Sequence, residues 1–145
     1  MNAETTISII AVSVSFLALL FSILTYQKGL KRQQKQATLE AYHTLQNEVL
    51  DKLNSYTRKQ IEEISHDPRS TQYKELSALL ARCEHFAVGI NSKIYDYTTL
   101  RKLAKVYFIG LYEKLLPLIE KKQRISPTER HYAEFETLVT KLKHE

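Results

Sequence analysis

The chain has 145 residues and a single cysteine, Cys83, so the sequence excludes an intramolecular disulfide and a cysteine-based zinc site. The net charge of +5 comes mostly from one short segment, because residues 36–145 hold 17 Lys and Arg against 15 Asp and Glu. So small an excess of positive charge excludes a domain that coats DNA or long RNA.

The first predicted element is a membrane-spanning helix over residues 7–26, a stretch of 20 residues without charge. As a helix it would be about 30 Å long, the thickness of the hydrocarbon core of a bilayer. Small residues on one helix face let membrane helices approach closely, so we expect a homo-oligomer, for example a tetramer. The small residues recur at alternating spacings of three and four, and they are Ser8, Ala11, Ser15, Ala18, Ser22 and Thr25.

Two other interpretations of this small-residue face remain open. Ser, Ala and Thr are ordinary in membrane helices, so the spacing can arise by chance. The hydroxyl groups can also line a water-filled cavity, where polar side chains at membrane depth are tolerated. The face therefore predicts a packing seam and is compatible with a latent pore.

The charges on either side of residues 7–26 predict the orientation of this helix. Only Glu4 and the amino terminus precede it, whereas four cations follow it: Lys28, Lys31, Arg32 and Lys35. Because Lys and Arg are retained on the cytoplasmic side, we expect the N-terminus outside the cell inner membrane and the later residues in the cytosol. The cations would contact lipid head groups. A cleaved signal peptide is not expected, because a positive segment before the apolar run and a small-x-small cleavage site are missing.

These observations predict three parts of the chain. Residues 1–27 form the N-terminal tail and transmembrane helix, residues 28–35 a basic juxtamembrane segment, and residues 36–145 a cytosolic helical domain. No segment shows sustained strand alternation, so the expected fold class is all-α, with a cytosolic bundle of about four helices.

The first two cytosolic helices are predicted from their apolar spacing. A long polar helix begins at Gln33 and keeps one apolar face as far as Tyr56, which makes residues 27–64 a continuous rigid link. The break comes at residues 65–70, which include proline. A second helix carries a wide apolar stripe from Leu76 to Ile90, the expected centre of the core.

Two further helices complete the predicted bundle. After a turn over residues 91–96, a third helix has apolar positions from Tyr97 to Leu115, and Pro117 is the expected site of a kink. The last helix is expected to start at the strongest capping pattern of the chain, which is Ser126, Pro127 and Glu129.

No catalytic or metal-binding pattern is found in the sequence. The five histidines make no HExxH or comparable spacing with acidic residues, so we expect no metal and no cofactor. Cys83 and His85 point in different directions on a helix, and Cys83 lies in the apolar stripe. Glu84 and Glu113 are expected to pair with arginines inside the bundle. We therefore predict that the protein is not an enzyme.

One turn combines cations, amides and hydroxyls with tyrosines, which suits a small anionic ligand. Cations can meet phosphates and tyrosines can stack on bases, and a helix beginning at Asp96 or Thr98 would add backbone N–H groups. The alternative is a solvated turn with core tyrosines and lysines that face water. The candidate ligand-binding residues are Asn91, Lys93, Tyr95, Tyr97, Thr98, Arg101, Lys102 and Lys105.

Three segments of the cytosolic part resemble an uncharacterised prokaryotic family. They are EHFAVGI at residues 84–90, YEKLLPLIEKKQR at 112–124 and HYAEFETL at 131–138. The members of this family are single-pass membrane proteins with a helical cytosolic domain. In layout alone, the chain also resembles the small membrane effectors of type III CRISPR antiviral defence that are switched by cyclic oligoadenylate.

The residue patterns, together with these resemblances, leave two hypotheses of different kinds for the function. In the first, the chain is a self-associating membrane effector that senses a small anionic ligand, such as cyclic tetra-adenylate, and perturbs the membrane in antiviral defence. In the second, it is a passive membrane anchor or scaffold whose helical domain docks a partner protein. A symmetric assembly favours the first, because it would repeat one weak subsite around a cyclic ligand.

Overall fold

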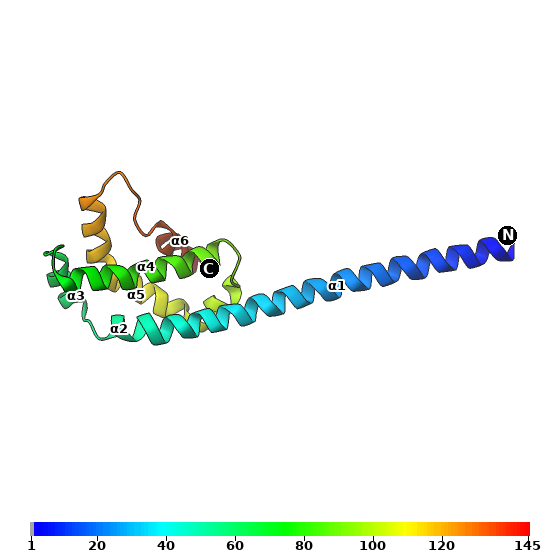
Figure 1. Ribbon diagram of the computed structural model, residues 1–145, viewed down its shortest axis with the longest axis horizontal. Helices are drawn as coiled ribbons and strands as arrows, with labels where there is room; N and C mark the ends of the chain where they lie inside the picture. Colours follow the sequence, from blue (N-terminus) through cyan, green and yellow to red (C-terminus); the bar gives the residue numbers. More distant parts are fainter. Residues whose placement is uncertain (1) are drawn as a thin grey trace. The chain divides into compact units, whose positions relative to one another are not determined.

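The computed structural model describes residues 2–145, which form helices and turns without any strand (Figure 1). This confirms the all-α class. The chain divides into two compact units, one ending at Gln34 and one spanning Lys35–Glu145. In chain order the elements are α1 (Ala3–Leu45), the π-helical turn η1 (Gln46–Leu50), α2 (Asp51–Asn54), α3 (Arg58–Ser65), α4 (Thr71–Asn91), α5 (Tyr97–Ile125) and α6 (Ala133–His144).

The first unit contains the apolar part of α1, which is long and apolar enough to span a membrane, with a mean hydropathy of 2.6. The side chains of residues 7–26 are all exposed; Phe21, for example, is 72% exposed. Each serine and threonine hydroxyl in this range donates to the carbonyl oxygen four residues earlier, at 2.8–2.9 Å. No polar group of these side chains therefore needs water as a partner.

The predicted continuous helix over residues 27–64 is wrong, because the chain changes direction at Thr57. One π-helical turn follows α1, and α2 ends at Asn54. Thr57 then caps α3: its hydroxyl accepts the Gln60 N–H at 3.3 Å, and the Gln60 side-chain oxygen accepts the Thr57 N–H at 2.8 Å. This reciprocal cap satisfies two backbone donors of a new helix, and its T-x-x-Q pattern is readable in the sequence.

The core of the second unit is built around α4, as its apolar stripe predicts. α4 packs against α6, α3 packs against α5, and α5 packs against α6. Phe108 of α5 is fully buried, and its ring centroid lies 5.8–6.4 Å from the centroids of four other rings. Edge-on and tilted contacts at such distances stabilise aromatic cores beyond the area they bury. The rings around Phe108 are Tyr42, Phe86, Tyr107 and Phe135.

The irregular point of α5 lies at Ala104, where φ is −144° and ψ is 18°. Pro117, the expected site of a kink, lies inside α5, which continues through this proline to Ile125. Ala104 is buried, and α5 consists of two helical segments that are joined by a kink at this residue. The departure from helical φ and ψ within α5 therefore lies at Ala104 and not at the proline.

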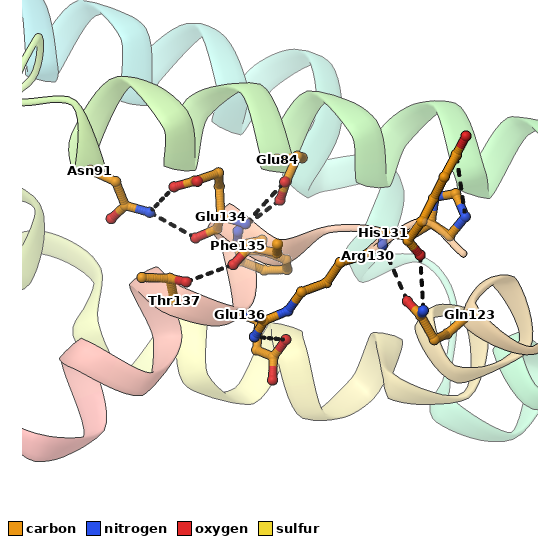
Figure 2. Close-up of polar contacts among 11 residues, drawn as sticks. Glu84, Asn91, Gln123, Arg130, His131, Glu134, Phe135, Glu136 and Thr137 are labelled. Carbon is orange, nitrogen blue, oxygen red and sulfur yellow. Dashed lines mark hydrogen bonds and ion pairs between the residues drawn. The ribbon is translucent and has the colours of Figure 1, made fainter. Parts of the chain in front are cut away.

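The start of α6 differs from the prediction. Ser126 ends α5 as its C-cap, and α6 begins only at Ala133 after Tyr132, whose φ of 58° is left-handed. The cap comes from another helix: the Glu84 carboxylate of α4 accepts the N–H groups of Glu134 and Phe135 at 3.0 and 2.7 Å (Figure 2). A carboxylate at a helix N-terminus satisfies donors that have no partner within the helix.

The expected pairing of Glu84 and Glu113 with arginines inside the bundle is also wrong. Glu84 binds backbone N–H groups, and Glu113 forms an ion pair with Lys143 at 3.0 Å. Both contacts join α6 to the helices beneath it. The C-terminal helix is held to the bundle by polar contacts at each end as well as by its buried apolar face.

Candidate functional site

The turn between α4 and α5 has the helix start that the sequence predicts. Asp96 caps α5: its carboxylate accepts the N–H of Thr99 at 2.8 Å and the Thr99 hydroxyl at 2.6 Å. The Asp96 N–H donates in turn to the hydroxyl of Thr38, which is fully buried, at 2.7 Å. The turn is thus anchored to the α1 segment of the second unit.

The other side of the turn closes α4 through a left-handed residue. Lys93 has a φ of 61°, and the N–H groups of Ile94 and Tyr95 both donate to the Gly89 carbonyl at 3.0 Å. This is the way in which helices commonly satisfy their last carbonyl groups, although glycine is the usual residue at such a position. The turn is therefore ordered from both helices.

Among the eight candidate ligand-binding residues, four side chains join separate parts of the bundle: Asn91, Tyr95, Tyr97 and Arg101. The Asn91 amide donates to the backbone and carboxylate oxygens of Glu134, at 2.9 and 2.7 Å (Figure 2). Tyr95 stacks on Phe86 with 5.6 Å between ring centroids.

The remaining two of these four residues contact the C-terminal segment. Lys141 Nζ lies 3.9 Å from the centre of the Tyr97 ring. Arg101 pairs with the Glu145 side chain at 3.6 Å. Burial, followed by the neighbouring Glu145 carboxylate, raises the pKa of Tyr97. These four side chains therefore hold the bundle together, as the alternative interpretation of the turn expects for its tyrosines.

The other four candidates are Lys93, Thr98, Lys102 and Lys105. Lys93, Thr98 and Lys102 are exposed, and Lys105 is partly exposed. Thr98 and Lys102 are one helical turn apart on α5, and Lys105 follows beyond the irregular Ala104. The set of exposed candidates is therefore smaller than the predicted site, and the two tyrosines of that site, Tyr95 and Tyr97, are only partly exposed.

A groove beside this turn has no counterpart in the sequence prediction. It lies within the second unit, has a volume of about 390 Å³, and is formed by the end of α1, the middle of α4 and Tyr95. Three side chains of α4 line the groove, namely Arg82, His85 and Phe86. Of these three, only Phe86 belongs to the apolar stripe that the sequence predicts. The lining residues are Ala41, Thr44, Leu45, Arg82, His85, Phe86 and Tyr95.

The reactive groups of the described residues are arranged for stability. Burial raises the pKa of the Cys83 thiol to about 12, so this side chain is a neutral core residue at physiological pH. Burial lowers the pKa of Lys114, whose ammonium group donates to the carbonyl oxygens of Leu53 and Tyr56 at 2.7 and 3.0 Å. Across residues 2–145, no group of three His, Cys, Asp or Glu side chains is placed to hold a metal ion.

Comparison with known proteins gives one match. The family described as a domain of unknown function, DUF4760, matches residues 9–142, so the chain belongs to this family. The matched range takes in most of the apolar helix together with the whole core of the bundle. No curated protein and no solved structure matches the chain.

Proposed function

We propose that this member of the DUF4760 family is a single-pass protein of the inner membrane with its helical domain in the cytosol. One observation carries the proposal: residues 7–26 expose an uncharged and mostly apolar surface, and each serine and threonine hydroxyl in this range donates within the helix. Exposure of such a surface to water is unfavourable. The hydrocarbon core of a bilayer, in contrast, requires apolar side chains and polar groups that are satisfied within the helix. The family match supports it as well, because its range covers most of the apolar helix together with the bundle.

The small-residue face of this helix is proposed to mediate self-association in the membrane. Because the hydroxyls of Ser15 and Ser22 already donate to their own helix, contact between copies would rely on close packing of backbones. This favours a packing seam over a row of hydroxyls that face water. The resulting assembly would bring several helical domains together on the cytosolic side.

The helical domain is proposed to act by binding a small anionic ligand and not by catalysis. The cations Lys102 and Lys105, exposed and partly exposed in the first third of α5, support this function. A cyclic oligonucleotide such as cyclic tetra-adenylate carries the charge and the symmetry that suit a homo-oligomer. Its binding would rearrange the assembly and perturb the membrane in antiviral defence.

Calorimetric titration of the full chain in lipid nanodiscs with cyclic tetra-adenylate and linear oligoadenylate tests this proposal. Wild-type protein should give saturable heat. The double variant Lys102→Ala and Lys105→Ala should bind about tenfold more weakly or worse, as the loss of charge-assisted contacts predicts. The matched control is Lys59→Ala with Lys74→Ala, two exposed lysines outside α5. An absence of heat with every oligoadenylate would exclude the nucleotide.

An exposed apolar strip on α5 favours a second function, in which the domain docks a partner protein. Val106 is 82% exposed and Leu103 is 50% exposed, and Gly110 follows one turn later, where an added Cβ atom would meet no neighbouring atom within 4 Å. Exposed apolar surface of this kind often marks a contact with another protein. In this function the chain is a membrane anchor, and the titration above would give no heat.

A further inference from the structure

The groove between α1 and α4 has the size and the lining of a small-molecule site. Its volume of about 390 Å³ lies within the range of ligand pockets. Leu45 and Phe86 form an apolar floor, since they are 5% and 6% exposed, and Ala41 borders it. Tyr95 closes one side, where its ring is held against Phe86.

Polar groups line the groove above this apolar floor. Arg82 and His85 come from α4 three residues apart, which places them on the same side of the helix. Thr44 adds a hydroxyl from α1. A guanidinium group binds carboxylate and phosphate oxygens through paired N–H groups, and an imidazole adds a further donor. This lining suits an anionic group attached to an apolar body.

The guanidinium group in the groove already has an anionic partner. Arg82 forms an ion pair with Glu48, which lies on η1, the only π-helical turn in residues 2–145. The two side chains are 49% and 50% exposed, and an exposed ion pair contributes little to stability. An incoming anion can therefore replace Glu48 at a small cost. Single π-helical turns are rare and are found frequently at functional sites.

From these contacts we infer that the groove is a binding site for a small organic anion, a phosphate or carboxylate on an apolar or aromatic body. Arg82 leaves Glu48 and binds the anionic group, His85 and Thr44 donate to it, and the body packs on Leu45 and Phe86. The inference goes beyond the proposed function, because it assigns a second anion site in the groove, separate from the lysines of α5.

The test is a titration of the full chain, in nanodiscs of zwitterionic lipid, with phenyl phosphate and with benzoate. Binding is measured by calorimetry, and its location by the shifts of backbone amide resonances. Wild-type protein should bind at least one probe with a dissociation constant in the millimolar range or tighter. The amide shifts should centre on Thr44, His85 and Tyr95.

Two variants give opposite expected effects. Arg82→Ala should weaken binding about tenfold or more, because it removes the charged donor. Glu48→Gln should strengthen binding by about two- to fivefold, because it removes the competing carboxylate. The matched controls are Arg124→Ala and Glu120→Gln, which alter another exposed ion pair at 3.6 Å and should leave binding unchanged.

The outcomes separate this inference from the proposed function. If neither probe binds, or if Arg82→Ala binds as well as wild type, the groove is not an anion site. If a probe binds with the expected dependence on Arg82 while no oligoadenylate binds, the groove inference holds and the proposed nucleotide is excluded. If Glu48→Gln weakens binding, the exchange of partners by Arg82 is excluded and the inference fails with it.

Discussion

At the scale of single residues, Gly89 is placed where only glycine fits. A Cβ atom at this position would overlap the ring of Tyr95, which stacks on Phe86 and closes one side of the groove. The carbonyl of Gly89 also accepts both N–H groups that end the turn. The absence of a side chain at Gly89 therefore decides where Tyr95 can lie.

Gly89→Ala should destabilise the fold and displace Tyr95. Forcing an extra methyl group into a packed site costs about 1–3 kcal/mol, which exceeds the gain in helix propensity. Urea unfolding followed by circular dichroism measures the change. The control is Gly110→Ala, which meets no atom within 4 Å and should stabilise the protein by about 0.5–1 kcal/mol. Equal effects of the two substitutions would contradict this account of Gly89.

Glu84 shows how far one side chain can act from its place in the sequence. Its two carboxylate oxygens cap α6 across 50 and 51 residues, and Asn91 holds Glu134 beside it. The pattern of Ser126, Pro127 and Glu129 predicted a local cap, but the chain uses these residues in the turn before α6. A cap that is supplied by a carboxylate of a distant helix leaves no pattern in the neighbouring residues. It therefore cannot be recognised from the spacing of residues in the sequence.

At the scale of elements, the apolar half of α1 and the bundle follow different rules. The bundle helices bury one face each, whereas residues 7–26 bury none. A helix with no buried face has to find its partner outside its own chain. The sequence predicts two such partners, which are the lipid of the bilayer and, along the small-residue face, another copy of the same helix.

Replacing Ala11, Ser15 and Ala18 together with leucine should weaken self-association in membranes. The added bulk would separate the backbones at the seam, and crosslinking of the full chain in membranes measures the result. The control places leucine at Ile9, Ser13 and Phe16, on the opposite side of the helix, and should keep the oligomer intact. Unchanged crosslinking in the seam variant would show that the seam does not hold the assembly.

At the scale of the whole molecule, the proposed topology makes a direct prediction about access from outside the cell. Cysteine introduced at Asn2 should react with a membrane-impermeant maleimide on intact cells. Cysteine at Thr140 should react only after permeabilisation, because Lys and Arg hold residues beyond 28 on the cytosolic side. Native Cys83 is fully buried, and its raised pKa of about 12 keeps background labelling low. Labelling of the Thr140 position on intact cells would contradict the topology.

The elements that depend on neighbouring residues could be predicted from the sequence. The all-α class, the apolar helix, the apolar stripe of α4 and the start of α5 at Asp96 follow from spacing and local capping. The break at Thr57 carried a readable local signal that was missed, because the apolar face continues past it.

The packing of distant residues was decided by the tertiary structure alone. Glu84 caps α6, Asn91 binds Glu134, and Arg82 reaches Glu48 in a groove that three separated segments line. Sequence spacing determined which side chains share a helix face, because helical geometry is local. It could not determine which faces meet, because that depends on how all the helices fill one core together.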